Sequence, residues 1–130
     1  MYLIDTNIFL ELLLEQEKAS SVAAFFKKID IDRMNLSELS LYSIGIILFK
    51  SKKLNLFSFF VDDILNNGIN VVNYPHTKLN DIRMISEKSS LDFDDAYQYA
   101  IAKEYNLTII SFDKDFDKTD IKRKEPLELL

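Results

Sequence analysis

The chain contains no cysteine, which excludes disulfide bonds, thiolate catalysis and cysteine-based zinc sites and agrees with a reducing, cytoplasmic location. Its single histidine, His76, lies in a Pro75-His76-Thr77 turn, so a histidine-centred triad or a histidine-rich metal site has too few members. Only two glycines and two prolines occur, and no apolar run approaches the ~20 residues of a membrane span. We therefore expect no linker and no membrane partner, and any chemistry must depend on carboxylates.

Length and charge narrow the class of protein further. The 130 residues correspond to one ordinary domain, and 48% hydrophobic residues are enough for one core, so we expect a single domain over residues 1–130. A strand that begins at the initiator methionine is expected to leave no room for a signal peptide. The net charge of -5 argues against a broad basic surface for nucleic acid, but it permits binding where metal ions neutralise an acidic site.

Two predicted strands stop at an acid. The short apolar run Tyr2-Leu3-Ile4 ends at Asp5, before a helix that we expect near residues 7–15. The best strand pattern in the chain, residues 107–112, runs directly into Asp113. The functional crevice of an open parallel α/β sheet lies outside the carboxyl ends of its strands, so both acids are expected there. The alternative for Asp5 is that it only caps the helix that follows.

Helical spacing of apolar residues predicts further helices over residues 22–29, 39–49, 54–65 and 79–85. The second of these carries Leu39, Tyr42, Ile46 and Phe49 on one face. Asn35-Leu36-Ser37-Glu38 fits a capping box at its start, and Gly45 within it requires a close packing contact to offset its low helix propensity. Asn67-Gly68 should end the next helix in the left-handed conformation, and Ile69–Asn73 then predicts a strand.

Three carboxylates open a helix predicted to run to about Asn106. Asp92 is the natural cap, while Asp94 and Asp95 lie in the first turn, where acids complement the helix dipole. Small residues beside Asp95 would let the helix pack closely on the sheet, so this acid should be partly buried. If Asp5, Asp95 and Asp113 lie together, their carboxylates repel one another by several kcal/mol. A bound cation such as Mg²⁺ or Mn²⁺ would remove this repulsion.

In three segments the sequence resembles PIN-domain proteins, a nuclease family that includes the ribonuclease toxins of type II toxin-antitoxin modules. Residues 3–9 match the amino-terminal signature of the family, Asp95-Ala96 matches its central acid, and Ser111-Phe112-Asp113-Lys114-Asp115-Phe116 matches its last acidic element. The resemblance implies a three-layer α/β/α fold with a central parallel sheet and hydrolysis of RNA in an acidic Mg²⁺ or Mn²⁺ pocket. It also implies a homodimer and a small antitoxin protein as partners.

In this interpretation Asp5, Asp95 and Asp113 hold the metal and are catalytic, and Asp115 is an outer ligand. The family usually carries a further acid, a glutamate on the third helix, and the best alignment puts Ser43 at its position. Glu38 is a substitute five residues earlier, but five helical residues turn it roughly 140° away from that direction. Its alternative role is the capping box. With Ser43 in place of the usual glutamate, the binding of a second metal ion, and therefore activity, is in question.

A basic cluster near the carboxyl terminus is the candidate for gripping RNA phosphates, since Lys118, Lys122, Arg123 and Lys124 follow Asp113 closely. A solvated loop is the alternative for this cluster. Two other functions remain open at this point. One is a PIN-like scaffold that has lost turnover and acts by RNA or protein binding. The other is a receiver-like phosphoacceptor, although that fold requires paired acids after its first strand and only Asp5 is present.

Overall fold

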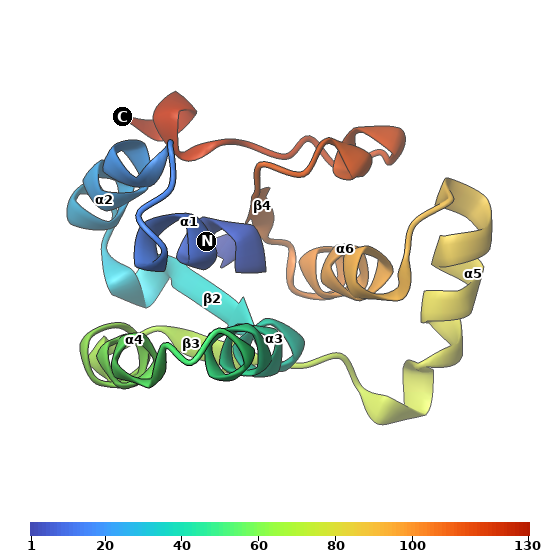
Figure 1. The fold of residues 1–130 in the computed structure, drawn as a ribbon. Helices are drawn as coiled ribbons and strands as arrows, with labels where there is room; N and C mark the ends of the chain where they lie inside the picture. Colours follow the sequence, from blue (N-terminus) through green and yellow to red (C-terminus); the bar gives the residue numbers. More distant parts are fainter.

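The centre of the protein is a parallel sheet, and the computed structural model describes all of residues 1–130. Its strands are β1 (Tyr2–Ile4), β2 (Met34–Ser37), β3 (Asn70–Val72) and β4 (Thr108–Ile110). They lie in the order β3-β2-β1-β4, and every pairing is parallel (Figure 1). Ile4 of β1 is paired with Ile110 of β4, so these neighbouring strands end at the same level. The predicted placement of Asp5 and Asp113 at one edge of the sheet follows from this register.

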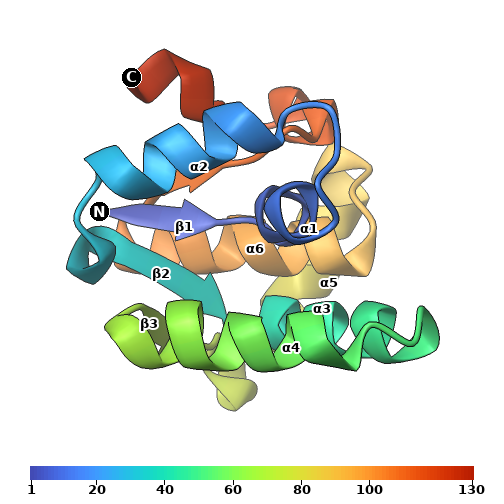
Figure 2. The same ribbon diagram turned by 60° about the vertical axis from the view of Figure 1, so that its left-hand side comes forward.

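Helices cover both faces of the sheet, which confirms the predicted three-layer α/β/α fold. They are α1 (Thr6–Leu13), α2 (Ala19–Lys28), α3 (Glu38–Lys50), α4 (Leu54–Phe59), α5 (Asn80–Ser89) and α6 (Phe93–Tyr105). Helices α1 to α4 pack on one face around Phe9, Phe25 and Phe60, and α5 and α6 pack on the other (Figures 1 and 2). Alternate residues of β1 serve the two cores, since Ile4 belongs to the first and Leu3 to the second. None of the helices has both the length and the apolar character needed to cross a membrane.

Strand β2 lies where the sequence analysis placed the beginning of a helix. All four of its residues are buried, and the amide of Asn35 donates to the backbone carbonyl of Tyr2 on the neighbouring strand at 3.0 Å. Helix α3 begins only at Glu38, and the hydroxyl of Ser37 caps it by accepting from the backbone N–H of Ser40 at 3.0 Å. The predicted capping box at residues 35–38 is therefore wrong. A polar residue between two apolar ones is compatible with either structure, and the sheet contact decided between them.

Helix α3 turns much of its apolar face outward. Tyr42, Ile46 and Phe49 are each more than half exposed, whereas Ile44 and Leu48 are buried. The outward face forms a groove with α4 and its continuation through residues 60–67, which ends as predicted at a left-handed Gly68 with φ of 115°.

At Gly45, in the wall of this groove, an added Cβ would lie 3.4 Å from the ring of Phe57, which is an ordinary van der Waals distance. The close packing contact predicted for this glycine is therefore not found. The groove lies between two helices, and apolar side chains line it.

The carboxyl-terminal segment forms a short extension of the sheet beside β4. The backbone N–H of Lys124 donates to the carbonyl of Ile109 at 2.9 Å, and Ser111 donates back to Lys124 at 3.0 Å. The last turn, Pro126–Leu129, then lies beside α2 (Figures 1 and 2). Lys124 is thus bonded to the edge of the sheet, whereas Lys122 is exposed to solvent.

Arg123 holds this segment in place. Its side chain is only 10% exposed, and it lies between Asp117, 3.1 Å from Nε, and Glu125, 3.0 Å from Nη1. The same guanidinium donates to the backbone carbonyl of Ser111 at 3.1 Å. These contacts raise the pKa of Arg123 above its ordinary value, against the effect of burial, because both carboxylates stabilise the charged form.

Replacing Arg123 by alanine should therefore destabilise the protein, by about 2 kcal/mol, since a part-buried carbonyl and two carboxylates lose their shared donor. Lys122→Ala is the matched control, because Lys122 is exposed and makes no side-chain hydrogen bond or ion pair. Urea unfolding of both variants measures the difference. Equal stability of the two variants would contradict a structural role for Arg123.

Candidate active site

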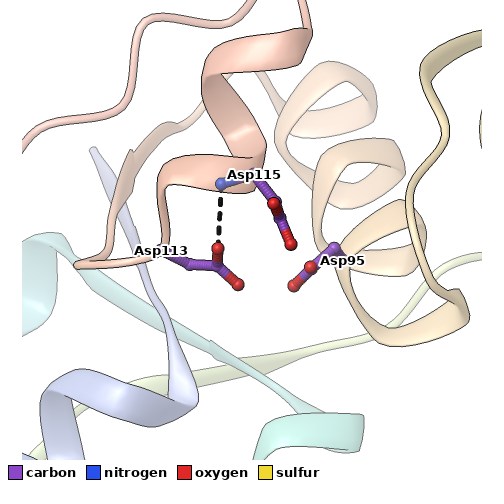
Figure 3. A group of neighbouring side chains, drawn as sticks. All are labelled: Asp95, Asp113 and Asp115. Carbon is purple, nitrogen blue, oxygen red and sulfur yellow. Dashed lines mark hydrogen bonds between the residues drawn. The ribbon is translucent and has the colours of Figure 1, made fainter.

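Three carboxylates converge at the carboxyl edge of the sheet. Asp95 comes from the first turn of α6, Asp113 follows β4, and Asp115 lies in the short 3-10 helix Lys114–Lys118. One oxygen of each lies within 4.8 Å of the others, and Figure 3 shows the three side chains pointing toward one another. Asp113 Oδ1 also accepts from the backbone N–H of Asp115 at 2.8 Å, which fixes the turn that carries both acids. Two segments distant in sequence thus build one acidic cluster.

Asp5 lies in the same cavity, but each of its oxygens already accepts two hydrogen bonds. Oδ1 accepts from the backbone N–H of Thr6 at 2.8 Å and from the amide of Gln98 at 3.1 Å. Oδ2 accepts from the hydroxyl of Ser111 at 2.6 Å and from the amide of Asn7 at 3.3 Å. A carboxylate has about four lone-pair sites, and these four donors occupy them. The structure therefore places Asp5 beside the three-acid cluster, as the centre of a separate hydrogen-bond network.

A cavity of about 320 Å³ connects the two groups of acids. Its wall combines four aspartates with neutral residues and includes no lysine, arginine or histidine. The lining residues are Asp5, Thr6, Asn7, Leu10, Leu39, Ser40, Ser43, Ile47, Asp94, Asp95, Gln98 and Asp113. Negative charge in this cavity is consequently not balanced by any basic side chain in its wall.

The acids respond to this environment with raised pKa values. Burial, followed by the charges of Asp113 and Asp94, raises the pKa of Asp95 to about 7. Burial also raises the pKa of Asp5, although the hydrogen bonds from Ser111 and Gln98 oppose that shift. Both shifts mean that the ionised carboxylates are destabilised by desolvation and by one another. A cation in the cavity would remove much of that cost.

The oxygens available in the cavity fit a hard divalent cation. Asp95, Asp113 and Asp115 offer carboxylate oxygens within reach of one ion, and no soft ligand is present. A further oxygen, Oε1 of Gln98, is buried in the cavity wall without a hydrogen-bond partner. Carboxylate and amide oxygens are the ligands that Mg²⁺ and Mn²⁺ take in proteins, so the residues present suit such an ion.

Ser43 and Glu38 are separated by the structure as their helical spacing predicts. Ser43 lines the cavity, so the position that the alignment gives to the usual acid of the third helix faces the acidic site. Glu38 does not line it. Its carboxylate accepts from the hydroxyl of Tyr42 at 2.7 Å and from the amide of Asn73 at 3.4 Å, which lower its pKa.

None of the basic residues proposed to bind RNA lines the cavity either. Lys118 forms an ion pair with Asp115 at 3.4 Å, and Arg123 is held by its own acidic neighbours. Phosphate binding by Arg123 would require it to leave those partners, whereas Lys122 is exposed. RNA binding by Lys122, Arg123 and Lys124 stays a prediction.

Several polar residues of the site escaped the sequence analysis. Ser40 and Gln98 join α3 to α6 at the back of the cavity, and Ser111 links β4 to Asp5. Asn7, assigned only to the start of a helix, bridges Asp5 and Ser111 and accepts from the backbone N–H of Phe112 at 3.2 Å. The signal that was available is the spacing of Gln98, which lies one helical turn after Asp95.

The fold and the acidic cavity together define an α/β protein with a candidate metal centre at the carboxyl edge of its sheet. The sequence model of the PIN domain family matches residues 2–122. The chain therefore belongs to the PIN domain family.

Solved structures of similar fold include a toxin and a toxin-antitoxin complex. The FitAcB structure from Neisseria gonorrhoeae matches with a TM-score of 0.77 and 23% identity over 97% of this chain and 98% of that one. VapC20 of Mycobacterium tuberculosis is described as a toxin that cleaves the sarcin-ricin loop. It matches with a TM-score of 0.82 and 13% identity over 97% of this chain and 100% of that one. A toxin-antitoxin complex from Klebsiella pneumoniae matches with a TM-score of 0.70 and 17% identity over 89% of this chain and 90% of that one. No curated protein matches the sequence.

The raised pKa of Asp95 predicts how stability changes with pH when no divalent cation is present. Between the unfolded pKa of 3.8 and the folded pKa of about 7, the folded state binds more protons than the unfolded state, so stability should fall as pH rises through this window. Asp95→Asn should remove that loss and stabilise the protein at pH 8 by up to about 4 kcal/mol.

Thermal unfolding in EDTA from pH 4 to pH 8 provides the measurement. Asp92→Asn is the control, since Asp92 is exposed and its side chain makes no capping hydrogen bond. A pH profile of Asp95→Asn that follows the wild-type profile would show that Asp95 is not strained by its neighbours.

Proposed function

We propose that this protein is a metal-dependent endoribonuclease and the toxin of a toxin-antitoxin pair. The observation that carries the proposal is the convergence of Asp95, Asp113 and Asp115 beside a cavity without basic side chains, in a member of the PIN domain family. Such a cavity repels a phosphodiester unless a cation is bound in it, so substrate binding and metal binding are coupled. Mg²⁺ or Mn²⁺ is the cofactor that this chemistry favours.

The reaction proposed is hydrolysis of an RNA phosphodiester bond. The oxygen of a water molecule bonds to phosphorus, the bond from phosphorus to O3′ breaks, and the proton released by water ends on O3′, which gives a 3′-hydroxyl and a 5′-phosphate. A bound divalent cation supplies charge neutralisation at the phosphate and a lowered pKa for water.

The chain itself supplies orientation. Asp113 and Asp115 are fixed by their turn, and Asp95 is fixed by α6. The network around Asp5 ties the ends of β1 and β4 together, because Ser111 donates to Asp5 across the two strands. The backbone positions of the three proposed ligands are thus set by the fold.

Asp113→Asn should lower kcat/KM for RNA cleavage by at least about 100-fold while the fold persists. The amide oxygen of asparagine can still accept from the backbone N–H of residue 115, so the turn survives, but one ligating charge is lost. Cleavage of a labelled single-stranded RNA in Mg²⁺, beside circular dichroism, is the measurement, with Asp92→Asn as control. Wild-type cleavage by Asp113→Asn would remove this residue from the catalytic site.

A second candidate function is the PIN-like scaffold with weakened turnover, and the presence of Ser43 in the cavity wall favours it. A serine contributes no charge where the alignment expects a glutamate. Under this alternative the protein binds a cation and RNA but cleaves slowly.

Ser43→Glu distinguishes the two functions. The added carboxylate should enter the cavity and tighten Mn²⁺ binding, and it should raise turnover by about 10-fold if only this acid was missing. Glu38→Ala is the control, because Glu38 lies outside the cavity and should affect neither quantity. If Glu38→Ala eliminates cleavage and Ser43→Glu changes nothing, the alignment of the third helix is wrong.

The proposed antitoxin partner has a suitable surface in the groove between α3 and α4. The groove measures about 530 Å³, and seven of its eight lining residues are hydrophobic. The eight lining residues are Leu41, Tyr42, Gly45, Ile46, Phe49, Phe57, Val61 and Leu65. An exposed apolar groove of this kind favours an amphipathic segment, and Lys50, Lys52 and Lys53 at its end favour acidic residues in that segment. The similarity to the toxin-antitoxin complex from Klebsiella pneumoniae supports an antitoxin as the occupant.

Ile46→Asp should abolish binding of the proposed antitoxin, since it places a charge in the centre of the groove. RNA cleavage should persist, because the groove is separate from the acidic cavity. Leu127→Asp, on an exposed apolar residue elsewhere, is the control.

Calorimetry measures the affinity for the partner, and sedimentation measures whether the protein is a monomer or the expected homodimer. If Ile46→Asp converts a dimer to a monomer and leaves partner binding unchanged, the groove belongs to a second copy of this chain and the assignment to an antitoxin fails.

A further inference from the structure

Gln98 is a neutral residue of the cavity wall whose amide nitrogen donates two hydrogen bonds and whose amide oxygen has no hydrogen-bond partner. It is 3% exposed and lies on α6 one turn after Asp95. Its amide nitrogen donates to Asp5 Oδ1 at 3.1 Å and to the hydroxyl oxygen of Ser40 at 2.9 Å. Its Oε1 is buried without any hydrogen-bond partner, a condition shared in this protein only by Oε2 of Glu11.

The contacts fix which end of the amide faces Asp5. Turning the amide over would place Oε1 against a carboxylate oxygen, which accepts but cannot donate, so the nitrogen must take this position. Oε1 is thereby directed away from Asp5. A buried amide oxygen without a donor destabilises the folded state, and folded proteins rarely retain one unless a ligand or an ion meets it.

We propose that Oε1 of Gln98 is a ligand of the divalent cation in this cavity and takes the place of the third-helix acid that is absent at Ser43. This inference rests on the proposed metal site. Hard cations accept amide oxygens as well as carboxylates, and Gln98 lines the same cavity as Asp95 and Asp113. The amide thus performs two tasks, since its nitrogen holds Asp5 and its oxygen meets the ion.

The choice of an amide has a consequence for the charge of the site. Glutamate at the position of Ser43 would add a negative charge to a cavity whose acids already repel one another, whereas Gln98 adds an oxygen ligand without charge. The site is therefore suited to one cation rather than two.

The unmodified protein allows a direct test, because the chain contains only two glutamines, Gln16 and Gln98. Gln16 is exposed and serves as an internal control. Glutamine labelled with ¹³C at Cδ gives two signals, which the Gln16→Met variant assigns. Addition of Mg²⁺ should shift the Gln98 signal and leave that of Gln16 in place. If Mg²⁺ binds at the aspartates and neither signal moves, the proposal is wrong.

Two variants separate the oxygen from the nitrogen. Gln98→Met removes both, and Gln98→Glu removes the donor to Asp5 but keeps an oxygen. Calorimetry with Mn²⁺ should show affinity about 10-fold weaker in Gln98→Met and at least equal to wild type in Gln98→Glu. Equal weakening in both would mean that Gln98 acts only by holding Asp5, and it would overturn the proposal. Absence of Mn²⁺ binding to the wild-type protein would instead remove the proposed function itself.

Discussion

Repulsion among carboxylates at one edge of a parallel sheet is the constraint on which this structure depends. The register of β1 and β4 brings Asp5 and Asp113 to the same edge of the sheet, and α6 adds Asp95. Burial and mutual repulsion raise the pKa of Asp95 to about 7, so the protein maintains this arrangement at a cost to its stability. Strain of this kind at a cavity is common where a cation or a substrate restores the balance.

The acids of the site divide into two kinds. Asp5 is surrounded by donors from α1, α6 and the end of β4, which together satisfy its oxygens. Asp95, Asp113 and Asp115 keep oxygens directed toward one another. One acid therefore connects the secondary-structure elements, and three acids gather negative charge that only Lys118, beside Asp115, partly balances. This division explains how a strongly acidic cavity retains a fixed shape.

The sequence predicted those features whose signals are local. A strand that stops at an acid is visible in a few adjacent residues, and both β1 with Asp5 and β4 with Asp113 were found in this way. Strand β2 was missed because Asn35 interrupts its apolar pattern, and the contact that satisfies this residue comes from Tyr2, far away in sequence. The exposure of Ile46 likewise depends on where α4 packs, which no local pattern records.

Contacts between residues distant in sequence also decide the surroundings of the basic residues and of Gln98. The basic residues near the carboxyl terminus were interpreted from their charge and their position after Asp113, and the sequence did not indicate that Arg123 is held by Asp117, Glu125 and a backbone carbonyl. Gln98 carries no charge and belongs to no motif, so its importance follows only from contacts with Asp5 and Ser40, which are distant in sequence.

The central claim is that the acidic cavity is built for a divalent cation. Crystals soaked in millimolar Mn²⁺ and measured at a wavelength where manganese scatters anomalously test it most directly. The account predicts one anomalous peak between the carboxylates of Asp95, Asp113 and Asp115. A map without a peak in this cavity, from crystals that diffract well and contain Mn²⁺ in the solvent, would contradict it.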